Sequence, residues 1–179
     1  MTSSLTVRDA TTADAAGCAA VYAPYVLGTA ASFETEPPGV DEVSHRIEAA
    51  LRTHAWVVAE RDGELVGYAY ATAYKPRPAY RWTCEVSVYV AGDRQHGGVG
   101  RSLYDDLLER LSARGYRSAV ASMTLPNPAS AHLHASLGFT PGGVLERVGW
   151  KDGRWHDVAL LRRDLGPGPH GSDPPAEPV

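Results

Sequence analysis

Cysteine, long apolar runs and runs of basic residues are all scarce in this sequence. Its 179 residues include only two cysteines, Cys18 and Cys84, far apart in the chain. Two such cysteines indicate neither a disulfide framework nor a zinc site, so a reducing, cytoplasmic setting is expected. No apolar run approaches the roughly 20 residues that cross a bilayer, and the beginning of the chain lacks a signal-peptide pattern, so no membrane partner is expected.

The charge balance excludes another class of partner. The formal net charge is −4 and no basic run stands out, which argues against nucleic acid as the main ligand. With 44% hydrophobic and 21% charged residues, the chain has the composition of an ordinary globular protein. We expect a single domain over residues 1–164, followed by a disordered tail rich in glycine and proline over residues 165–179.

The most informative segment is a glycine-rich turn that joins an apolar strand, 86–90, to a helix. Such a turn directs backbone N–H groups outward at a helix N-terminus, where the helix dipole favours an anion such as phosphate. Gly98 and Gly100 leave room for a pyrophosphate, and Arg94 and Arg101 flank the turn. The segment therefore predicts a phosphate-binding site.

The glycine spacing decides which phosphate ligand is expected. No Gly-x-x-x-x-Gly-Lys-Ser/Thr string of a P-loop exists here. A dinucleotide fingerprint fails because Leu103 occupies the place of its third glycine, which disfavours a nucleotide-dependent oxidoreductase. What remains, Gln95-x-x-Gly98-x-Gly100, resembles the acetyl-CoA signature of the GNAT acetyltransferases. A glycine-rich strand-to-helix turn without a ligand is the alternative.

Hydrophobic periodicity and turn signals predict an α/β protein. The expected element order is β-α-α-β-β-β-α-β-α-β-β over roughly residues 5–164, which matches the GNAT acyltransferase fold, a mixed and mostly antiparallel central sheet flanked by helices. The expected strands cover residues 5–8, 56–61, 64–74, 82–90, 118–123, 144–150 and 155–165. The helices are expected to begin near Asp14, Asp41, Gly98 and Asn127, with Asn127 as an N-cap followed by a proline.

Two side chains are candidates for the chemistry of acetyl transfer, in which a neutral amine attacks a thioester with help from a base. Glu85 is an unusual carboxylate in the middle of a strand, and the alternative for it is an exposed face or an ion pair with Arg77 or Arg81. His134 is the second candidate, and a surface or half-buried histidine is its alternative. His132 and His134 point apart on a helix, so no metal site is expected.

A cluster of cations, Lys75, Arg77 and Arg81, precedes the strand of Glu85 together with Tyr80. This loop suits an anionic substrate, although a solvated polar loop is the alternative.

Several blocks in order resemble the phosphinothricin N-acetyltransferases, a family that includes methionine sulfoximine acetyltransferases. The blocks are Phe33-x-Thr35-Glu36-Pro37, Trp82-Thr83-x-Glu85-x-Ser87-Val88-Tyr89-Val90, Leu125-Pro126-Asn127, Leu133-His134-x-x-Leu137-Gly138-Phe139 and Trp155-His156-Asp157-Val158. The resemblance implies acetyl-CoA as donor, the α-amino group of a small amino-acid-like acceptor as nucleophile, Glu85 as general base, and a homodimer. Many GNAT enzymes carry a tyrosine general acid at the position of His134, where this family carries histidine.

The resemblance also implies the binding residues. It assigns acetyl-CoA to Val88, Val90, Gln95, His96, Gly97, Gly98, Val99, Gly100, Arg101 and Asn127. It assigns the acceptor to Phe33, Lys75, Arg77, Tyr80, Ser87, Tyr89 and Val158.

Departures from the family pattern keep the acceptor open. Glu34 stands where an arginine can occur beside the matched phenylalanine, which is expected to alter the acceptor's charge preference. Two other functions are alternatives: an acetyl-CoA-binding sensor without turnover, and acetylation of another amine such as a protein N-terminus or an aminoglycoside. A polycationic aminoglycoside fits poorly beside Lys75, Arg77 and Arg81.

Overall fold

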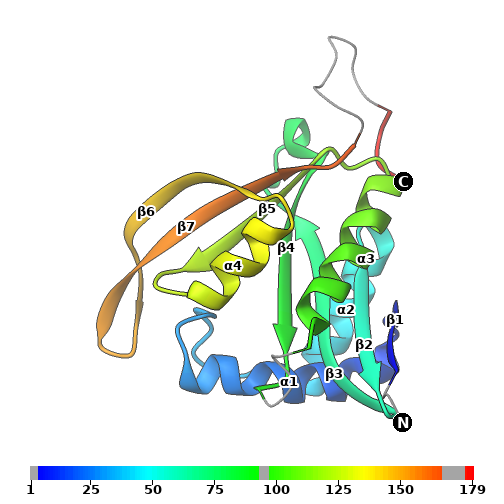
Figure 1. The fold of residues 1–179 in the computed structure, drawn as a ribbon, viewed down its shortest axis with the longest axis horizontal. Coiled ribbons are helices and arrows are strands. Elements are labelled where there is room, and N and C mark those ends of the chain that lie inside the picture. Colours follow the sequence, from blue (N-terminus) through cyan, green and yellow to red (C-terminus); the bar gives the residue numbers. More distant parts are fainter. Residues whose placement is uncertain (1–3, 93–96, 167–175) are drawn as a thin grey trace.

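The computed structural model describes residues 4–92, 97–166 and 176–179, and it has the predicted GNAT architecture (Figure 1). A seven-stranded sheet has the order β1-β2-β3-β4-β5-β7-β6. Its strands are β1 (Leu5–Asp9), β2 (Trp56–Arg61), β3 (Glu64–Ala73), β4 (Thr83–Val90), β5 (Ser118–Thr124), β6 (Thr140–Lys151) and β7 (Arg154–Asp164). The helices are α1 (Ala15–Gly28), α2 (Val40–Thr53), α3 (Val99–Ala113) and α4 (Pro128–Ser136). Neighbouring strands are antiparallel except β4 and β5, which are parallel.

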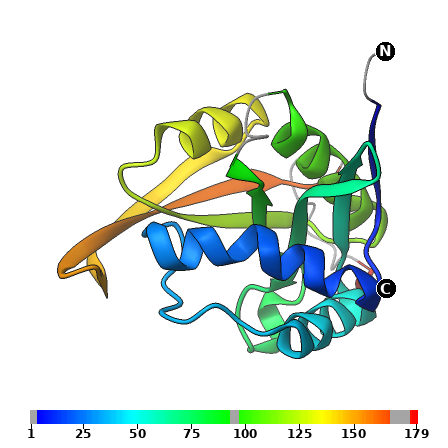
Figure 2. The ribbon, with the colours of Figure 1, turned by 90° about the horizontal axis from the view of Figure 1, so that it is seen from below.

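Helices cover both faces of the sheet, so the core has two parts (Figure 2). On one face, α3 and part of α4 pack on residues such as Val57 and Ala69. On the other face, α1 and α2 pack on Val58 and Tyr68. Because successive residues of a strand point to opposite faces, Val57 and Val58 of β2 enter different clusters.

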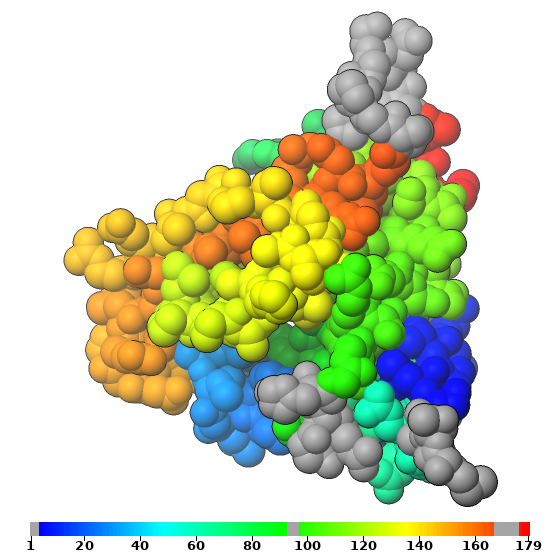
Figure 3. Space-filling view, in the orientation of Figure 1, coloured from blue at the N-terminus to red at the C-terminus, as the bar shows by residue number. Residues whose placement is uncertain are grey.

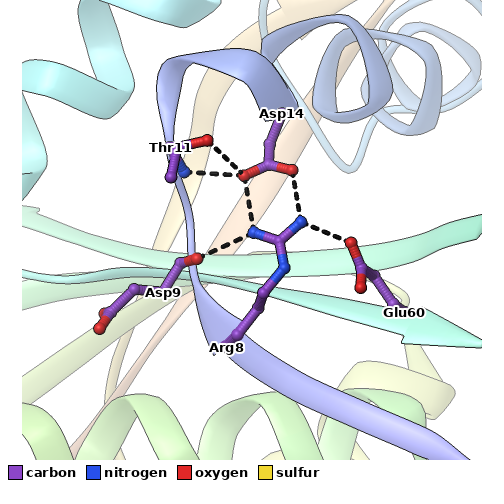
Figure 4. Close-up of polar contacts among 5 residues, drawn as sticks. All are labelled: Arg8, Asp9, Thr11, Asp14 and Glu60. Atoms are coloured by element: carbon purple, nitrogen blue, oxygen red, sulfur yellow. Dashed lines mark hydrogen bonds and ion pairs between the residues drawn. The ribbon is translucent and has the colours of Figure 1, made fainter. Parts of the chain in front are cut away.

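A polar network joins the first strand to the first helix (Figure 4). The Arg8 guanidinium donates to both carboxylate oxygens of Asp14, at 2.9 and 2.7 Å, and to Glu60 Oε1 at 2.5 Å. The Thr11 backbone N–H also donates to Asp14, at 2.7 Å, as part of a capping box between Thr11 and Asp14. Arg8 holds the pKa of the Asp14 carboxyl below its usual range, which keeps Asp14 charged. The network thereby ties the turn between β1 and α1 to the sheet.

The predicted helix boundaries agree with the structure to within a few residues. Asp14 closes a short 3₁₀ turn, Thr12–Asp14, which leads into α1. The second helix begins at Val40 instead of Asp41. Asn127 caps α4 as predicted, because its Oδ1 accepts a hydrogen bond from the Ser130 N–H at 3.0 Å.

The closing hairpin is longer than the sequence indicated. The predicted strand 144–150 is part of β6, which runs from Thr140 to Lys151. Pro141, Gly142 and Gly143 are ordinarily turn signals, but pairing with β7 carries the strand through them by a shift of register between Pro141 and Gly143. Long-range pairing therefore overrides the local signal.

The core continues slightly past the predicted domain end at residue 164. Leu165 is buried, and its N–H donates to the Arg117 carbonyl at 2.8 Å. Residues 176–179 of the predicted tail lie against the domain: the Trp82 Nε1–H donates to the Ala176 carbonyl at 2.9 Å, and Glu177 forms an ion pair with Arg81. Residues 167–175 lie outside the described residues. Within the part of the chain that is described, no helix is long and apolar enough to cross a membrane.

Candidate active site

The candidate site lies at the gap where β4 and β5 separate. The two strands pair only at Thr83↔Ser118, Cys84↔Ala119 and Glu85↔Val120. Beyond Glu85, β4 continues to pair with β3 as far as Val90, and β5 continues with β7 as far as Thr124. Beyond Glu85 the facing edges are therefore not paired with each other, and at Val90 the Tyr25 hydroxyl bonds the backbone of the β4 edge. Figure 3 shows the surface hollowed where α3 (green), α4 (yellow) and the α1–α2 connection (blue) meet.

The N-terminus of α3 lies at the end of β4, as the glycine turn predicted. Gly97 and Gly98 have φ angles of 119° and 76°, which a residue with a side chain rarely adopts. Gly100 serves helix packing as well, because a Cβ there would lie 3.3 Å from Leu133 Cδ2 of α4. Val99 is fully buried, so its side chain belongs to the core. Arg94, Gln95 and His96 lie outside the described residues.

Other predicted cofactor residues already have partners. Arg101 reaches Ser136 of α4 at 3.3 Å and lies 3.5 Å from Asp105. The backbone N–H and carbonyl of Val90 contact the Tyr25 hydroxyl at 3.3 and 2.6 Å. Val88 is half-buried and packs against the α3-side core. The Asn127 side chain uses Oδ1 for the cap, and its amide nitrogen carries two donors besides.

Glu85 lies at the last paired position before the gap. Its Oε1 accepts a hydrogen bond from the Ser122 hydroxyl of β5 at 2.7 Å. Its strand alternates as predicted, since Cys84 and Val86 enter the α3-side core whereas Tyr89 packs with α1 residues. Within the described residues, neither Arg77 nor Arg81 pairs with Glu85, so the ion-pair alternative finds no support.

Tyrosines line the face of the sheet that carries Glu85. Tyr22 lies edge-on to Tyr89, with ring centroids 4.7 Å apart. Burial raises the pKa of Tyr22 to about 12, and it also raises the pKa of Tyr70, whose hydroxyl interacts with Ser87. The negative charges of Glu34 and Glu85 also raise the pKa of Tyr70. These phenols stay neutral near neutral pH and can donate hydrogen bonds to a ligand.

Glu34 does not present an unbalanced charge. Arg46 of α2 donates to its two carboxylate oxygens at 2.7 and 3.4 Å, and the Tyr22 hydroxyl donates to Oε1 at 3.0 Å. The charge of Glu34 is therefore offset by Arg46, a residue that the sequence reasoning missed. The available signal was its position on the polar face of α2, four residues after its second partner Glu42.

The structure brings some predicted acceptor residues together and leaves others apart. Phe33 packs against His156 of β7, with ring centroids 6.0 Å apart. Val158 pairs with Thr124 at the β5 side of the gap. Lys75 and Tyr80 instead gather around Tyr74, in the loop that contains Pro78–Tyr80. Within the described residues, no polar contact joins that loop to Glu85.

His134 is buried between α3 and α4, with an exposed fraction of 4%. Its Nδ1 lies 2.7 Å from the Ser130 carbonyl, which can only accept, so Nδ1 carries the hydrogen. The other ring nitrogen, Nε2, lies 3.2 Å from the Tyr104 hydroxyl and accepts from it. Burial lowers the pKa of His134, which favours this neutral form. His132 is exposed, and the described residues contain no group of three or more side chains suited to a metal ion.

Comparisons with known proteins agree with this geometry. Residues 7–160 match the family described as "Acetyltransferase (GNAT) domain". This chain belongs to the GNAT acetyltransferase family. Phosphinothricin N-acetyltransferase of Alcaligenes faecalis is 45% identical to this GNAT acetyltransferase over 165 residues, which cover 91% of this chain and 84% of the relative. L-methionine sulfoximine/L-methionine sulfone acetyltransferase of Pseudomonas paraeruginosa is 35% identical over 166 residues, covering 92% of this chain and 96% of the relative.

A solved structure extends the likeness to three dimensions. The crystal structure of a GNAT superfamily phosphinothricin acetyltransferase from Sinorhizobium meliloti, in complex with AcCoA, superimposes on this GNAT acetyltransferase with a TM-score of 0.91. The two chains are 36% identical, and the match covers 99% of this chain and 95% of the other.

The neutral state of His134 predicts a pH dependence of stability. Unfolding restores the ordinary pKa of about 6.5, so below that pH the unfolded chain binds a proton that the folded chain resists. The stability from His134 is present above about pH 6.5 and is lost as the pH falls. We expect the urea midpoint to drop less between pH 7.5 and pH 5.5 in His134→Asn than in the control His132→Asn. Equal drops in the two variants would contradict this.

Proposed function

We propose that this GNAT acetyltransferase moves the acetyl group of acetyl-CoA to the α-amino group of a small amino-acid-like acceptor, of the phosphinothricin or methionine sulfoximine type. The observation that carries the proposal is the position of Glu85. This carboxylate stands at the edge of the β4–β5 gap, held by Ser122 at 2.7 Å and without a cationic partner among the described residues. A site that only bound acetyl-CoA as a sensor would have no use for such a base.

Acetyl-CoA fits the open end of the sheet. The β4 edge at Val88 offers backbone groups to its amide-containing arm, whereas at Val90 the arm must displace the Tyr25 hydroxyl, and the N-terminus of α3 offers N–H groups to its pyrophosphate. The predicted turn, Gln95 to Arg101, and Asn127 complete the proposed cofactor site. When bound, acetyl-CoA supplies an activated acetyl thioester whose thiol is a good leaving group.

Glu85 acts as the general base in this proposal. An α-ammonium group must lose a proton before its nitrogen can attack, and the Glu85 carboxylate accepts that proton directly or through a water. The Ser122 hydroxyl fixes one carboxylate oxygen, so the other is left to face the acceptor. The nitrogen then forms a bond to the acetyl carbon as the bond to sulfur breaks.

His134 remains the second candidate for a catalytic role. Its lowered pKa leaves little imidazolium at neutral pH, and a thiol of pKa about 8.5 needs little help to leave. We therefore expect its contribution to be smaller than that of Glu85. In its neutral form it orients the buried Tyr104 hydroxyl through Nε2.

The acceptor is proposed to lie on the tyrosine-lined face. Phe33, Ser87, Tyr89 and Val158 form the walls, and the hydroxyls of this face donate hydrogen bonds. Lys75, Arg77 and Tyr80 are proposed to meet the acceptor's anionic groups.

A homodimer is the proposed assembly. The outer strand β6 and its turn expose Val144, Val148 and Trp150, and Trp150 is 60% exposed. Trp155 of β7 lies edge-on to Trp150, with ring centroids 5.4 Å apart. An edge strand with a row of exposed apolar side chains favours association with another chain.

The two cysteines are free and buried, which suits the proposed cytoplasmic location.

A panel of acceptors tests the proposed activity. We expect acetyl-CoA-dependent release of CoA thiol with phosphinothricin, methionine sulfoximine or methionine sulfone, and little release with peptides or aminoglycosides. Mass spectrometry should show the acetyl group on the α-nitrogen. Tight acetyl-CoA binding with no turnover on the whole panel would instead support a sensor.

The role of Glu85 is tested by Glu85→Gln, which keeps the shape and the Ser122 hydrogen bond but removes the base. We expect kcat to fall by roughly 10²–10⁴-fold at neutral pH with acetyl-CoA affinity unchanged. The loss should shrink at high pH, where more of the amine is already neutral. The exposed Glu48→Gln is the matched control, and equal kcat values for the two variants would remove Glu85 from the mechanism.

The dimer is tested by the mass in solution. Light scattering should give twice the chain mass of 19.1 kDa for the wild type. Trp150→Ser should shift the protein toward the monomer, because it removes apolar area from the exposed patch. Val40→Ser changes another exposed apolar residue, on α2, and should leave the mass unchanged. A monomeric wild type at micromolar concentration would refute the proposed assembly.

A further inference from the structure

The α1–α2 connection is held by a buried cation from the other end of the chain. Lys151, the last residue of β6, is only 7% exposed. Its Nζ donates to the Val26 carbonyl at 2.6 Å and to the Ser32 carbonyl at 2.7 Å. Val26 lies in the last turn of α1, where carbonyls lack helical partners and the helix dipole attracts a positive charge. Lys151 therefore joins the end of α1 to the connection that follows it.

Ser32 is fixed on both sides. Its carbonyl accepts from Lys151, and its hydroxyl lies 2.6 Å from the Tyr22 hydroxyl of α1. The Glu34 N–H also donates to the Ser32 hydroxyl, at 3.1 Å. The backbone on either side of Phe33 is thus held by hydrogen bonds, although residues 29–39 form no helix or strand.

The Phe33 ring has a matching place on the hairpin. A Cβ added at Gly149 would lie 2.1 Å from Phe33 Cε2 and 2.3 Å from Cζ, so only glycine leaves room for the ring. His156 is the register partner of Gly149, and it contacts the ring from β7. The His156 ring is itself held, because its Nε2 lies 3.0 Å from the Lys151 carbonyl. We call Gly149, Lys151 and His156 the Phe33 seat.

We propose that Lys151 is a positioning residue that holds Ser32 so that Phe33 stays in its seat and forms one wall of the acceptor pocket. The ring is 39% exposed, so one side rests on the seat while the other stays open to a ligand. This inference rests on the proposed function, in which Phe33 contacts the acceptor. Lys151 has no proposed role in binding acetyl-CoA, because the contacts of Lys151 lie on the α1–α2 connection and the hairpin.

Lys151→Met tests whether Lys151 holds the α1–α2 connection in place, since methionine fills similar space without the ammonium. Arg154→Met is the matched control, because Arg154 is the exposed register partner of Lys151 across the hairpin turn. We expect backbone amides of residues 29–36 to exchange hydrogen at least about tenfold faster in Lys151→Met and at the wild-type rate in Arg154→Met. Unchanged exchange in folded Lys151→Met would overturn the proposal.

Steady-state kinetics test whether the position of Phe33 affects binding of the acceptor. We expect Lys151→Met to raise the acceptor KM about tenfold, with the acetyl-CoA KM and kcat within about twofold of wild type. Gly149→Ala keeps Lys151 but displaces the ring, so it should raise the acceptor KM similarly, and it keeps the test available if Lys151→Met does not fold. In a Phe33→Ala background both substitutions should lose their effect on the acceptor KM. Full effects in that background would overturn the proposal.

The exchange and kinetic experiments distinguish a failure of the role of Lys151 from a failure of the proposed function. If the wild type transfers acetyl to no amino-acid acceptor, the proposed function fails and the acceptor half of the inference fails with it. The exchange comparison of Lys151→Met with Arg154→Met then still decides whether Lys151 holds the connection.

Discussion

The limited pairing of β4 with β5 is the constraint on which the rest of the structure depends. A parallel pair needs a crossover connection, and here α3 provides it, beginning where β4 ends. The crossover helix packs over β3, β2 and β4, and its N-terminus lies beside the end of β4, where β4 and β5 no longer pair. The contact of Gly100 with Leu133 then brings α4 to the other side of the same opening. One short ladder thus sets the places of the gap, the glycine turn and the carboxylate.

The partners of the buried polar groups explain why Glu85 stands out. Asp14 is bound by Arg8, and Glu34 is bound by Arg46. The ammonium of Lys151 is satisfied by two carbonyls, and both ring nitrogens of His134 have partners. Glu85 is half-buried on a strand and, among the described contacts, is held by a neutral hydroxyl. A carboxylate in that state is available to accept a proton, whereas an ion-paired carboxylate has its charge already stabilised.

The proposed acceptor side of the site comes from segments that are far apart in the chain. Phe33 comes from the α1–α2 connection, Tyr70 and Tyr89 come from the central strands, and His156 comes from the closing hairpin. The central strands are packed between helices on both of their faces. The connection has no such support from regular structure, so its order depends on individual hydrogen bonds and on the fit of a single ring against a glycine.

Local signals in the sequence were sufficient for the element order and the glycine turn. Periodicity, the Asn127 cap and the start of a helix after Gly98 depend on residues close in the chain, so these predictions held in the structure. The alternation that turns Glu85 away from Cys84 and Val86 is equally local. The full length of β6, however, depends on its pairing with β7 through Pro141 to Gly143.

Other features were decided by tertiary structure alone. The pairing of Arg46 with Glu34, the burial of Lys151 beside Ser32, and the neutral form of His134 each require two elements to meet in space. Composition and spacing carry no information on such meetings, because the energy of a buried charge or imidazole depends on the groups that surround it. The sequence by itself determined the order of the elements and which residues are candidates for the chemistry, and only the packed structure decided which groups surround each of them.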